Sequence, residues 1–195
     1  MSGAWREGVL RTDAGGHARG GVLKFGGSLL TRPGWEVELV ALARRVDAPV
    51  TVVVGGGGIV DGLRAIDAAS PLPAEVTHRL AIDSLALTAR LAADATGLPR
   101  TTEPGTDSVA ILDVPAWLAV AARWHALPVG WHVTSDSIAA FVAASCGDCL
   151  VLAKSVPPPA ADIIAAAAAG WVDPHFPRAA EAVRAIRWTA PGPDA

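Results

Sequence analysis

The chain has 195 residues, a length that fits one α/β domain with a sizeable core, although two very small domains also fit. Half of the residues (51%) are hydrophobic and only 18% are charged, a composition that argues against disorder. The net charge of −3 gives no basic footprint for nucleic acid. No apolar run reaches the roughly 20 residues that cross a bilayer, so a cytoplasmic protein without a membrane partner is expected.

The elements predicted along the chain alternate between strands and helices. Residues 1–20 are polar and rich in glycine, which predicts a flexible tail without a secretory signal. Strands are then expected at 21–25, 50–54, 109–112, 131–134, 150–153 and an edge strand at 188, and helices at 35–45, 59–69, 75–95, 115–124, 136–144, 160–169 and 178–186. This alternation predicts an α/β sandwich around a mostly parallel sheet, with ligands bound beyond the carboxyl ends of the strands.

Two glycine loops follow the first two predicted strands. Lys24 stands just before Gly26, Gly27 and Ser28, so a fixed cation lies beside backbone N–H groups that can approach an anion, and Ser28 can cap the next helix. The loop Gly55–Gly58 follows a β-branched strand, and four successive glycines indicate backbone held against a phosphate or a polar substrate. A plain turn remains the alternative for each loop, and neither matches a Walker A or GxGxxG motif.

Polar residues also follow two later strands. The segment Thr134–Ser137 opens a predicted helix, and its four polar residues exceed what one N-cap needs. Lys154 and Ser155 follow the strand at 150–153. The sequence contains two lysines, Lys24 and Lys154, and its other Lys/Arg positions are arginine. Both strand ends are therefore expected to need a compact ammonium group, which acts as a point charge toward phosphate.

The two cysteines, Cys146 and Cys149, lie at a predicted helix end just before a strand. A redox pair would open a helix instead, and a zinc site would need a second ligand cluster, which does not follow. Two ordinary thiols near a turn are therefore favoured over a redox or zinc-binding role.

Taken in this order, the loops resemble those of the amino acid kinase family. The family's first motif, Lys-x-Gly-Gly-Ser, is matched by residues 24–28, and its glycine loop by residues 55–58. Segments 133–140 and 150–156 resemble the small archaeal kinases of methanofuran biosynthesis, which act on an aminomethyl-furan-methanol phosphate, and their bacterial relatives. Gly170–Phe176 fits a Gly-x-Val-Asp-x-x-Phe pattern of that group, and the resemblance runs from about residue 21 to 177.

The resemblance implies a carbamate kinase-like three-layer αβα sandwich, one amino acid kinase-like domain over residues 21–190, and a homo-oligomer. It implies an ATP-dependent kinase with Mg²⁺ held by phosphate oxygens, acting on a small-molecule acceptor. The catalytic residues would be Lys24 on the transferring phosphoryl group, Lys154 on the leaving phosphates, and Asp136 orienting both lysines. Further implied contacts are phosphate binding by Gly26, Gly27 and Ser28, acceptor binding by Gly55, Gly56, Gly57, Gly58 and His78, and nucleotide binding by Thr134, Ser135, Lys154, Ser155 and Asp173.

The sequence departs from the family pattern in the half that binds nucleotide. Pro157–Pro159 replaces an Asp-Gly-Val stretch, and a late Gly-Gly-Met-x-x-Lys motif is absent. The expected function is a kinase of a furan-methanol phosphate in methanofuran- or methylofuran-type cofactor biosynthesis. Two alternatives stay open: a nucleotide- or oxyanion-binding storage protein on the same fold, and a kinase of an acetylglutamate- or carbamate-like acceptor, for which Arg64 is the candidate carboxylate ligand.

Overall fold

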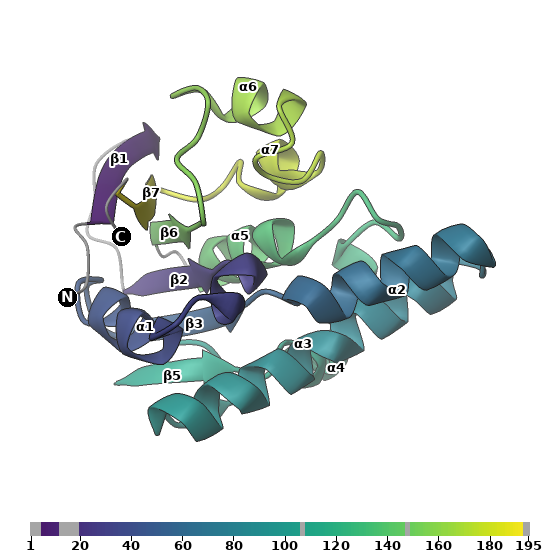
Figure 1. Ribbon diagram of the computed structural model, residues 1–195, viewed down its shortest axis with the longest axis horizontal. Coiled ribbons are helices and arrows are strands. Elements are labelled where there is room, and N and C mark those ends of the chain that lie inside the picture. The colour runs from purple at the N-terminus through teal and green to yellow at the C-terminus, as the bar shows by residue number, and fades with distance from the viewer. Residues whose placement is uncertain (1–4, 12–19, 106–107, 147–148, 193–195) are drawn as a thin grey trace.

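A computed structural model of the chain describes residues 5–11, 20–105, 108–146 and 149–192. A twisted sheet runs through these residues in the order β1-β7-β6-β2-β3-β5-β4 (Figure 1). Its strands pair in parallel, apart from β1, which lies antiparallel to β7 at one edge. The strands are β1 (Trp5–Arg11), β2 (Gly21–Phe25), β3 (Val50–Val54), β4 (Arg100–Thr101), β5 (Val109–Leu112), β6 (Cys149–Ala153) and β7 (Ile186–Pro191).

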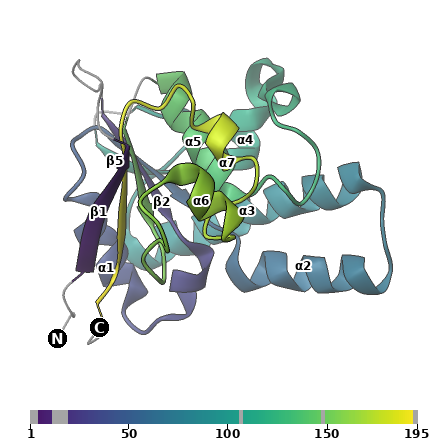
Figure 2. The same ribbon diagram turned by 90° about the horizontal axis from the view of Figure 1, so that it is seen from above.

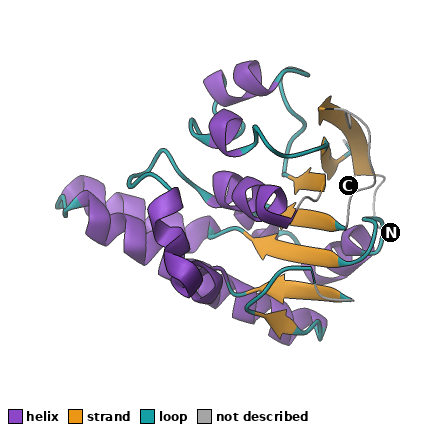
Figure 3. Cartoon of the chain, turned by 180° about the vertical axis from the view of Figure 1, so that it is seen from behind, coloured by secondary structure: helices purple, strands orange, loops and turns teal. Residues whose placement is uncertain are grey.

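Helices cover both faces of this sheet (Figure 3). They are α1 (Trp35–Ala43), α2 (Gly57–Ala69), α3 (Ala74–Thr96), α4 (Val114–Ala119), α5 (Ser135–Cys146), α6 (Ile163–Ala168) and α7 (Phe176–Ala179), with 3₁₀ turns η1 (Gly27–Thr31) and η2 (Val120–Ala126). Alternate residues of β2 face different cores, because successive side chains of a strand point to opposite faces. Val22 packs with α5 in one core, and Leu23 packs with α1 in the other. The predicted three-layer αβα sandwich is confirmed.

The N-terminal stretch contains a strand that the sequence did not predict. Residues 5–11 form β1, so the expectation of a flexible tail over 1–20 is wrong for this part, while 12–19 lie outside the described residues. None of the side chains of β1 is fully buried, and its attachment is a backbone ladder to β7. A strand without a buried face leaves no apolar alternation to detect. Because β1 takes the edge, Trp188 lies in an inner strand between β1 and β6.

Two other predicted elements differ from the structure. The strand expected at 131–134 is a turn that leads into α5. Its aromatic and β-branched residues suit a strand, but here they make side-chain contacts around a pocket. The helix expected at 178–186 is limited to the short α7, and residue 186 already begins β7.

Helices α2 and α3 form a hairpin that projects beyond the carboxyl ends of the strands (Figure 2). No residue of α2 is fully buried, and this helix packs against both α3 and the 3₁₀ turn η1. The hairpin extends the wall around the ends of β2 and β3. Within the described residues, none of the helices has both the length and the apolar character required to cross a membrane.

Candidate active site

A pocket lies where the sequence expects one, beyond the carboxyl ends of β2, β3 and β6. These parallel strands end side by side, so the loops that follow them meet at one edge of the sheet. The pocket has a volume of about 240 Å³. Ten of the predicted site residues line it: Lys24, Gly27, Ser28, Gly56, Gly57, His78, Thr134, Ser135, Asp136 and Lys154.

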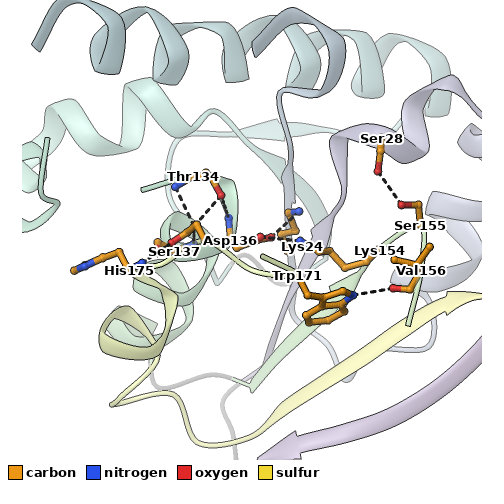
Figure 4. Close-up of polar contacts among 11 residues, drawn as sticks. Lys24, Ser28, Thr134, Asp136, Ser137, Lys154, Ser155, Val156, Trp171 and His175 are labelled. Carbon is orange, nitrogen blue, oxygen red and sulfur yellow. Dashed lines mark hydrogen bonds and ion pairs between the residues drawn. The ribbon is translucent and has the colours of Figure 1, made fainter. Parts of the chain in front are cut away.

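The two lysines of the chain meet on one carboxylate at the floor of this pocket (Figure 4). The Nζ of Lys24 lies 2.7 Å from Oδ1 of Asp136, and the Nζ of Lys154 lies 2.7 Å from Oδ2. Lys24 and Asp136 are each 4% exposed, so both charges are almost fully removed from water. Both ammonium groups therefore lie close enough to contact one polyphosphate together, as the resemblance implies, while their catalytic roles stay a prediction.

Electrostatics keep this cluster positive at neutral pH. Burial raises the pKa of Asp136, but Lys24 and Lys154 together outweigh burial, so the pKa lies below its ordinary value and the carboxylate is charged. Burial first, and then repulsion from Lys24, lower the pKa of Lys154 to about 8, against the attraction of Asp136. At pH 7 two ammonium groups therefore surround one carboxylate, and the surplus positive charge favours an anion.

The lowered pKa of Lys154 predicts how anion binding depends on pH. Below pH 8 the ammonium form of Lys154 dominates, and an anion favours that form. Above pH 8 the amine must first take up a proton from solution, which weakens the apparent affinity for the anion. The affinity for sulfate, whose own charge stays constant in this range, is therefore expected to fall as pH rises through about 8, by up to about tenfold per pH unit. Isothermal titration calorimetry between pH 6.5 and 9.5 measures this. An affinity that stays constant over that range would contradict the assigned charge state.

The two glycine loops pack directly against each other, and the absence of side chains allows their backbones to approach this closely. A Cβ at Gly27 would lie 2.1 Å from the backbone N of Gly57, and a Cβ at Gly57 would lie 2.6 Å from the carbonyl oxygen of Gly27. Gly57 also has a φ of 52°, in the left-handed region that side chains disfavour. The loops after β2 and β3 therefore touch through glycine, which gives these glycines a structural reason besides the ligand contact inferred from the sequence.

Replacing Gly27 by alanine is accordingly expected to destabilise the protein by about 1–3 kcal/mol, because the new methyl group overlaps fixed backbone atoms. Gly58→Ala is the matched control, since a Cβ there meets nothing within 4 Å in the first turn of α2. Urea unfolding followed by circular dichroism measures both variants. Equal stability of the two variants would show that the loop contact is unimportant.

Five of the predicted residues lie outside the lining of the pocket. The N–H of Gly26 donates to the carbonyl oxygen of Ala153 at 2.8 Å, and the N–H of Gly55 donates to that of Phe25 at 2.8 Å. Both amides therefore extend the hydrogen bonding between neighbouring strands at their carboxyl ends and are not directed at an anion. Gly58 is exposed on α2.

The other two are Ser155 and Asp173. Ser155 is exposed, and its hydroxyl lies 3.3 Å from that of Ser28. Ser28 belongs to η1 and does not cap a helix there, which corrects the capping role expected for it. Asp173 is buried behind the first turn of α5, where its carboxylate accepts hydrogen bonds from Thr134 and Ser137. This position separates Asp173 from the pocket, contrary to the nucleotide contact that the resemblance implies.

The far wall of the pocket includes a tryptophan that the sequence did not assign, beside Arg64, the carboxylate ligand expected for one alternative acceptor. Trp131 lines it, and its indole N–H donates to Oδ2 of Asp67 at 2.7 Å. The guanidinium of Arg64 lies 5.1 Å from the centre of the Trp131 ring and also lines the pocket. The remaining wall is mostly apolar and is formed by Val60, Ala81, Ile82, Leu85, Val133 and Ile138. Trp131 was missed because its segment was predicted to be a strand.

His78 lies on the same wall, where it projects from α3 toward the turn that carries Trp131. It is 8% exposed, and its Nδ1 accepts a hydrogen bond from the N–H of Gly130 at 3.4 Å. Burial lowers the pKa of His78, so its imidazole is neutral at pH 7. The structure therefore gives this histidine a buried place in the pocket wall, and its contact with an acceptor stays a prediction.

No family model matches this chain, and no curated protein matches its sequence. Among solved structures it is similar to the uridylate kinase from Archaeoglobus fulgidus, with a TM-score of 0.52, 18% sequence identity, and coverage of 71% of this chain and 64% of that one. The chain therefore spans less than two thirds of the length of that kinase. At this identity the similarity establishes the fold alone, and the fold is that of the amino acid kinases.

Proposed function

We propose that the protein is an ATP-dependent kinase that transfers a phosphoryl group to a small-molecule acceptor. The observation that carries this proposal is the convergence of Lys24 and Lys154 on Asp136 at the floor of the pocket. Phosphoryl transfer passes through a loose and highly charged transition state, so catalysis depends mainly on positioning and electrostatic stabilisation. A pocket with surplus positive charge and glycine backbone around it meets both needs. The similarity in fold to a uridylate kinase supports the same class of reaction.

The residues present fit Mg-ATP as the phosphoryl donor. An acceptor oxygen attacks the γ-phosphorus while the bond to the β,γ-bridging oxygen breaks, and ADP leaves with the electron pair. Lys24 would stabilise the transferring group, and Lys154 would stabilise the charge that develops on ADP. Both oxygens of Asp136 already contact lysines, so Mg²⁺ would be held mainly by phosphate oxygens, where it supplies further charge neutralisation.

For the acceptor, we propose an aminomethyl-furan-methanol phosphate of methanofuran- or methylofuran-type cofactor biosynthesis. The apolar wall and Trp131 give a flat ring a surface on which to pack. Asp61 also lines the pocket, and its carboxylate pairs with the guanidinium of Arg64 at 3.0 Å, so an ammonium group of the acceptor would bind Asp61 in competition with Arg64. The phosphate oxygen of the acceptor would then face Lys24.

A kinase of an acetylglutamate- or carbamate-like acceptor is the second candidate. Arg64 was the expected carboxylate ligand for such an acceptor, and its place in the lining of the pocket supports this reading. A storage protein that binds a nucleotide or an oxyanion is the alternative outside the enzymes. The same charge cluster would serve it, and Pro157–Pro159 in place of the family's nucleotide-binding stretch is consistent with altered nucleotide contacts.

A product assay distinguishes these functions. The purified protein is incubated with Mg-ATP and one acceptor at a time. The acceptors are an aminomethyl-furan-methanol phosphate, acetylglutamate, carbamate and a nucleoside monophosphate, and the products are identified by mass spectrometry. Phosphorylation of the furan phosphate supports the leading proposal, and phosphorylation of a carboxylate acceptor supports the second. Tight binding of Mg-ATP with no product from any acceptor supports storage. No binding of Mg-ATP would overturn the kinase proposal.

We also propose that the chain works as a homo-oligomer in the cytoplasm. The support for association is a row of apolar side chains exposed along α3, at Val76, Leu80, Leu87 and Leu91. Their spacing of about one or two helical turns places them along one side of the helix. Sedimentation of the purified protein measures its oligomeric state directly.

A further inference from the structure

The turn between α6 and α7 contacts two separate parts of the charge cluster without lining the pocket. This turn contains Gly170, Trp171 and Asp173. Asp173 contacts the segment that carries Asp136, and Trp171 contacts Lys154. Neither residue is explained by the kinase chemistry described above, and both are buried at 7% exposure or less.

Asp173 caps a helix to which it does not belong. Its Oδ2 accepts the N–H of Thr134 at 2.9 Å, the hydroxyl of Thr134 at 2.7 Å and the N–H of Ser137 at 3.0 Å. Its Oδ1 accepts the hydroxyl of Ser137 and the N–H of His175 at 3.1 Å. These bonds satisfy an amide at the start of α5 that would otherwise need an N-cap side chain. The first turn of α5 is thereby fixed, and Asp136 is the second residue of that turn.

Trp171 supports the other half of the cluster. Its ring centre lies 5.2 Å from the Nζ of Lys154, within the range of a cation–π interaction (Figure 4). Its indole N–H donates to the carbonyl oxygen of Val156 at 2.9 Å, which fastens the loop that leaves β6. The ring therefore contacts the lysine and holds the backbone two residues beyond it.

Gly170 gives the turn its direction. It has a φ of 72°, its N–H donates to the carbonyl oxygen of Ala167 at 2.9 Å, and the N–H of Trp171 donates to that of Ala166 at 3.0 Å. This pair of bonds is a Schellman motif, which ends a helix at a left-handed residue and favours glycine there. The end of α6 thus turns the chain so that Trp171 and Asp173 reach different sides of the cluster.

We infer that the Gly170–Asp173 turn is a positioning device for the phosphate site, in which Asp173 fixes Asp136 through α5 and Trp171 fixes Lys154 through its ring. The role in a phosphate site rests on the proposed function, whereas the effect of the turn on Lys154 can be measured without turnover. The two residues act through Asp136 and Lys154 and are positioning residues. Because the ring stabilises the ammonium form, the lysine is easier to deprotonate when the ring is removed.

The charged groups that face Lys154 are Asp136, Lys24 and Asp173, and the pKa of Lys154 reports on all three. Because the chain has two lysines, protein labelled with ¹³C at lysine Cε gives two signals, and Lys154→Arg assigns them. Burial is the main cause that lowers the pKa of Lys154, and leucine keeps the site apolar, so Trp171→Leu chiefly removes the cation–π contact. The variant is therefore expected to lower the pKa of Lys154 by about half a unit or more, and Trp171→Phe by less. Asp173→Asn is also expected to lower it, because a carboxylate is lost. Asp173→Asn should in addition weaken Mg-ATP binding about tenfold or more.

Matched controls separate this role from general damage. Trp124 packs under the guanidinium of Arg79 at 4.0 Å, away from the pocket, and Asp162 caps α6 through the N–H of Ala165. Trp124→Leu and Asp162→Asn are expected to leave the titration of Lys154 unchanged. An unchanged titration in folded Trp171→Leu and Asp173→Asn would overturn the inference, and if Trp171→Leu does not fold, an unchanged Trp171→Phe overturns the part that concerns the ring. Failure of wild-type protein to bind Mg-ATP would instead overturn the kinase proposal, since the lysine titrations do not depend on it.

Discussion

Replacing Asp136 by alanine is expected to reduce kinase turnover by about 100-fold or more, because the carboxylate that holds both lysines is lost. The same change should destabilise the fold by about 3–5 kcal/mol at neutral pH, since it leaves ammonium groups buried without their partner. Asp136→Asn keeps the shape of the side chain and tests the charge alone. Steady-state turnover and urea unfolding of each variant measure the two effects.

The loss of stability in Asp136→Ala should depend on pH in a defined direction. Without the carboxylate, the pKa of Lys154 falls further in the folded protein, while the unfolded chain keeps the ordinary value for lysine, near 10.4. Between these values the unfolded state binds more protons, so the stability of the variant rises with pH. Asp94→Ala is the control, because that carboxylate pairs with Arg90 on the exposed side of α3. Full turnover in folded Asp136→Asn would remove Asp136 from the mechanism.

The sequence predicted the sheet best where strands are buried on both faces. The observed bounds of β2, β3 and β5 match the expected residues. Each is a short, mostly apolar run that is buried on both faces, which is typical of strands in a parallel sheet. The meeting of Lys24 and Lys154 was also predictable, since both lie at strand ends and parallel strands bring such positions to one edge. The place of Asp136 between them was implied by the resemblance alone, because the strand expected before it is a turn.

What the sequence did not reveal depends on contacts between distant residues. Asp173 caps α5 from 36 residues away, and no local pattern marks a cap of that kind. Trp131 belongs to a segment with the composition of a strand, yet a hydrogen bond to Asp67 holds it in a pocket wall. The strand β1 has no buried face, so only its pairing with β7 identifies it. Each case is a tertiary contact that overrides a local preference.

Replacing Lys24 by methionine is expected to lower turnover by about 100-fold or more without the loss of stability expected for Asp136→Ala. Methionine fills a similar volume but carries no charge. The variant therefore loses one ammonium group and keeps Lys154 and Asp136 as a neutral ion pair. No buried charge is then left without a partner, so the variant avoids the loss of stability that an unpaired buried charge causes. The two variants therefore separate catalysis from folding. Arg90→Met, at an exposed ion pair on α3, is the matched control for loss of a cation.

The same variant makes a second, independent measurement possible. Repulsion from Lys24 is one of the causes that lower the pKa of Lys154, so its removal should raise that pKa above about 8. In ¹³C-lysine protein the variant gives one remaining signal, whose titration should move to higher pH. Loss of turnover together with this upward shift would show that the two ammonium groups act on one phosphoryl site through a shared field. A titration of Lys154 that does not move would show that the lysines do not interact, and the paired-lysine mechanism would then fail even if turnover is lost.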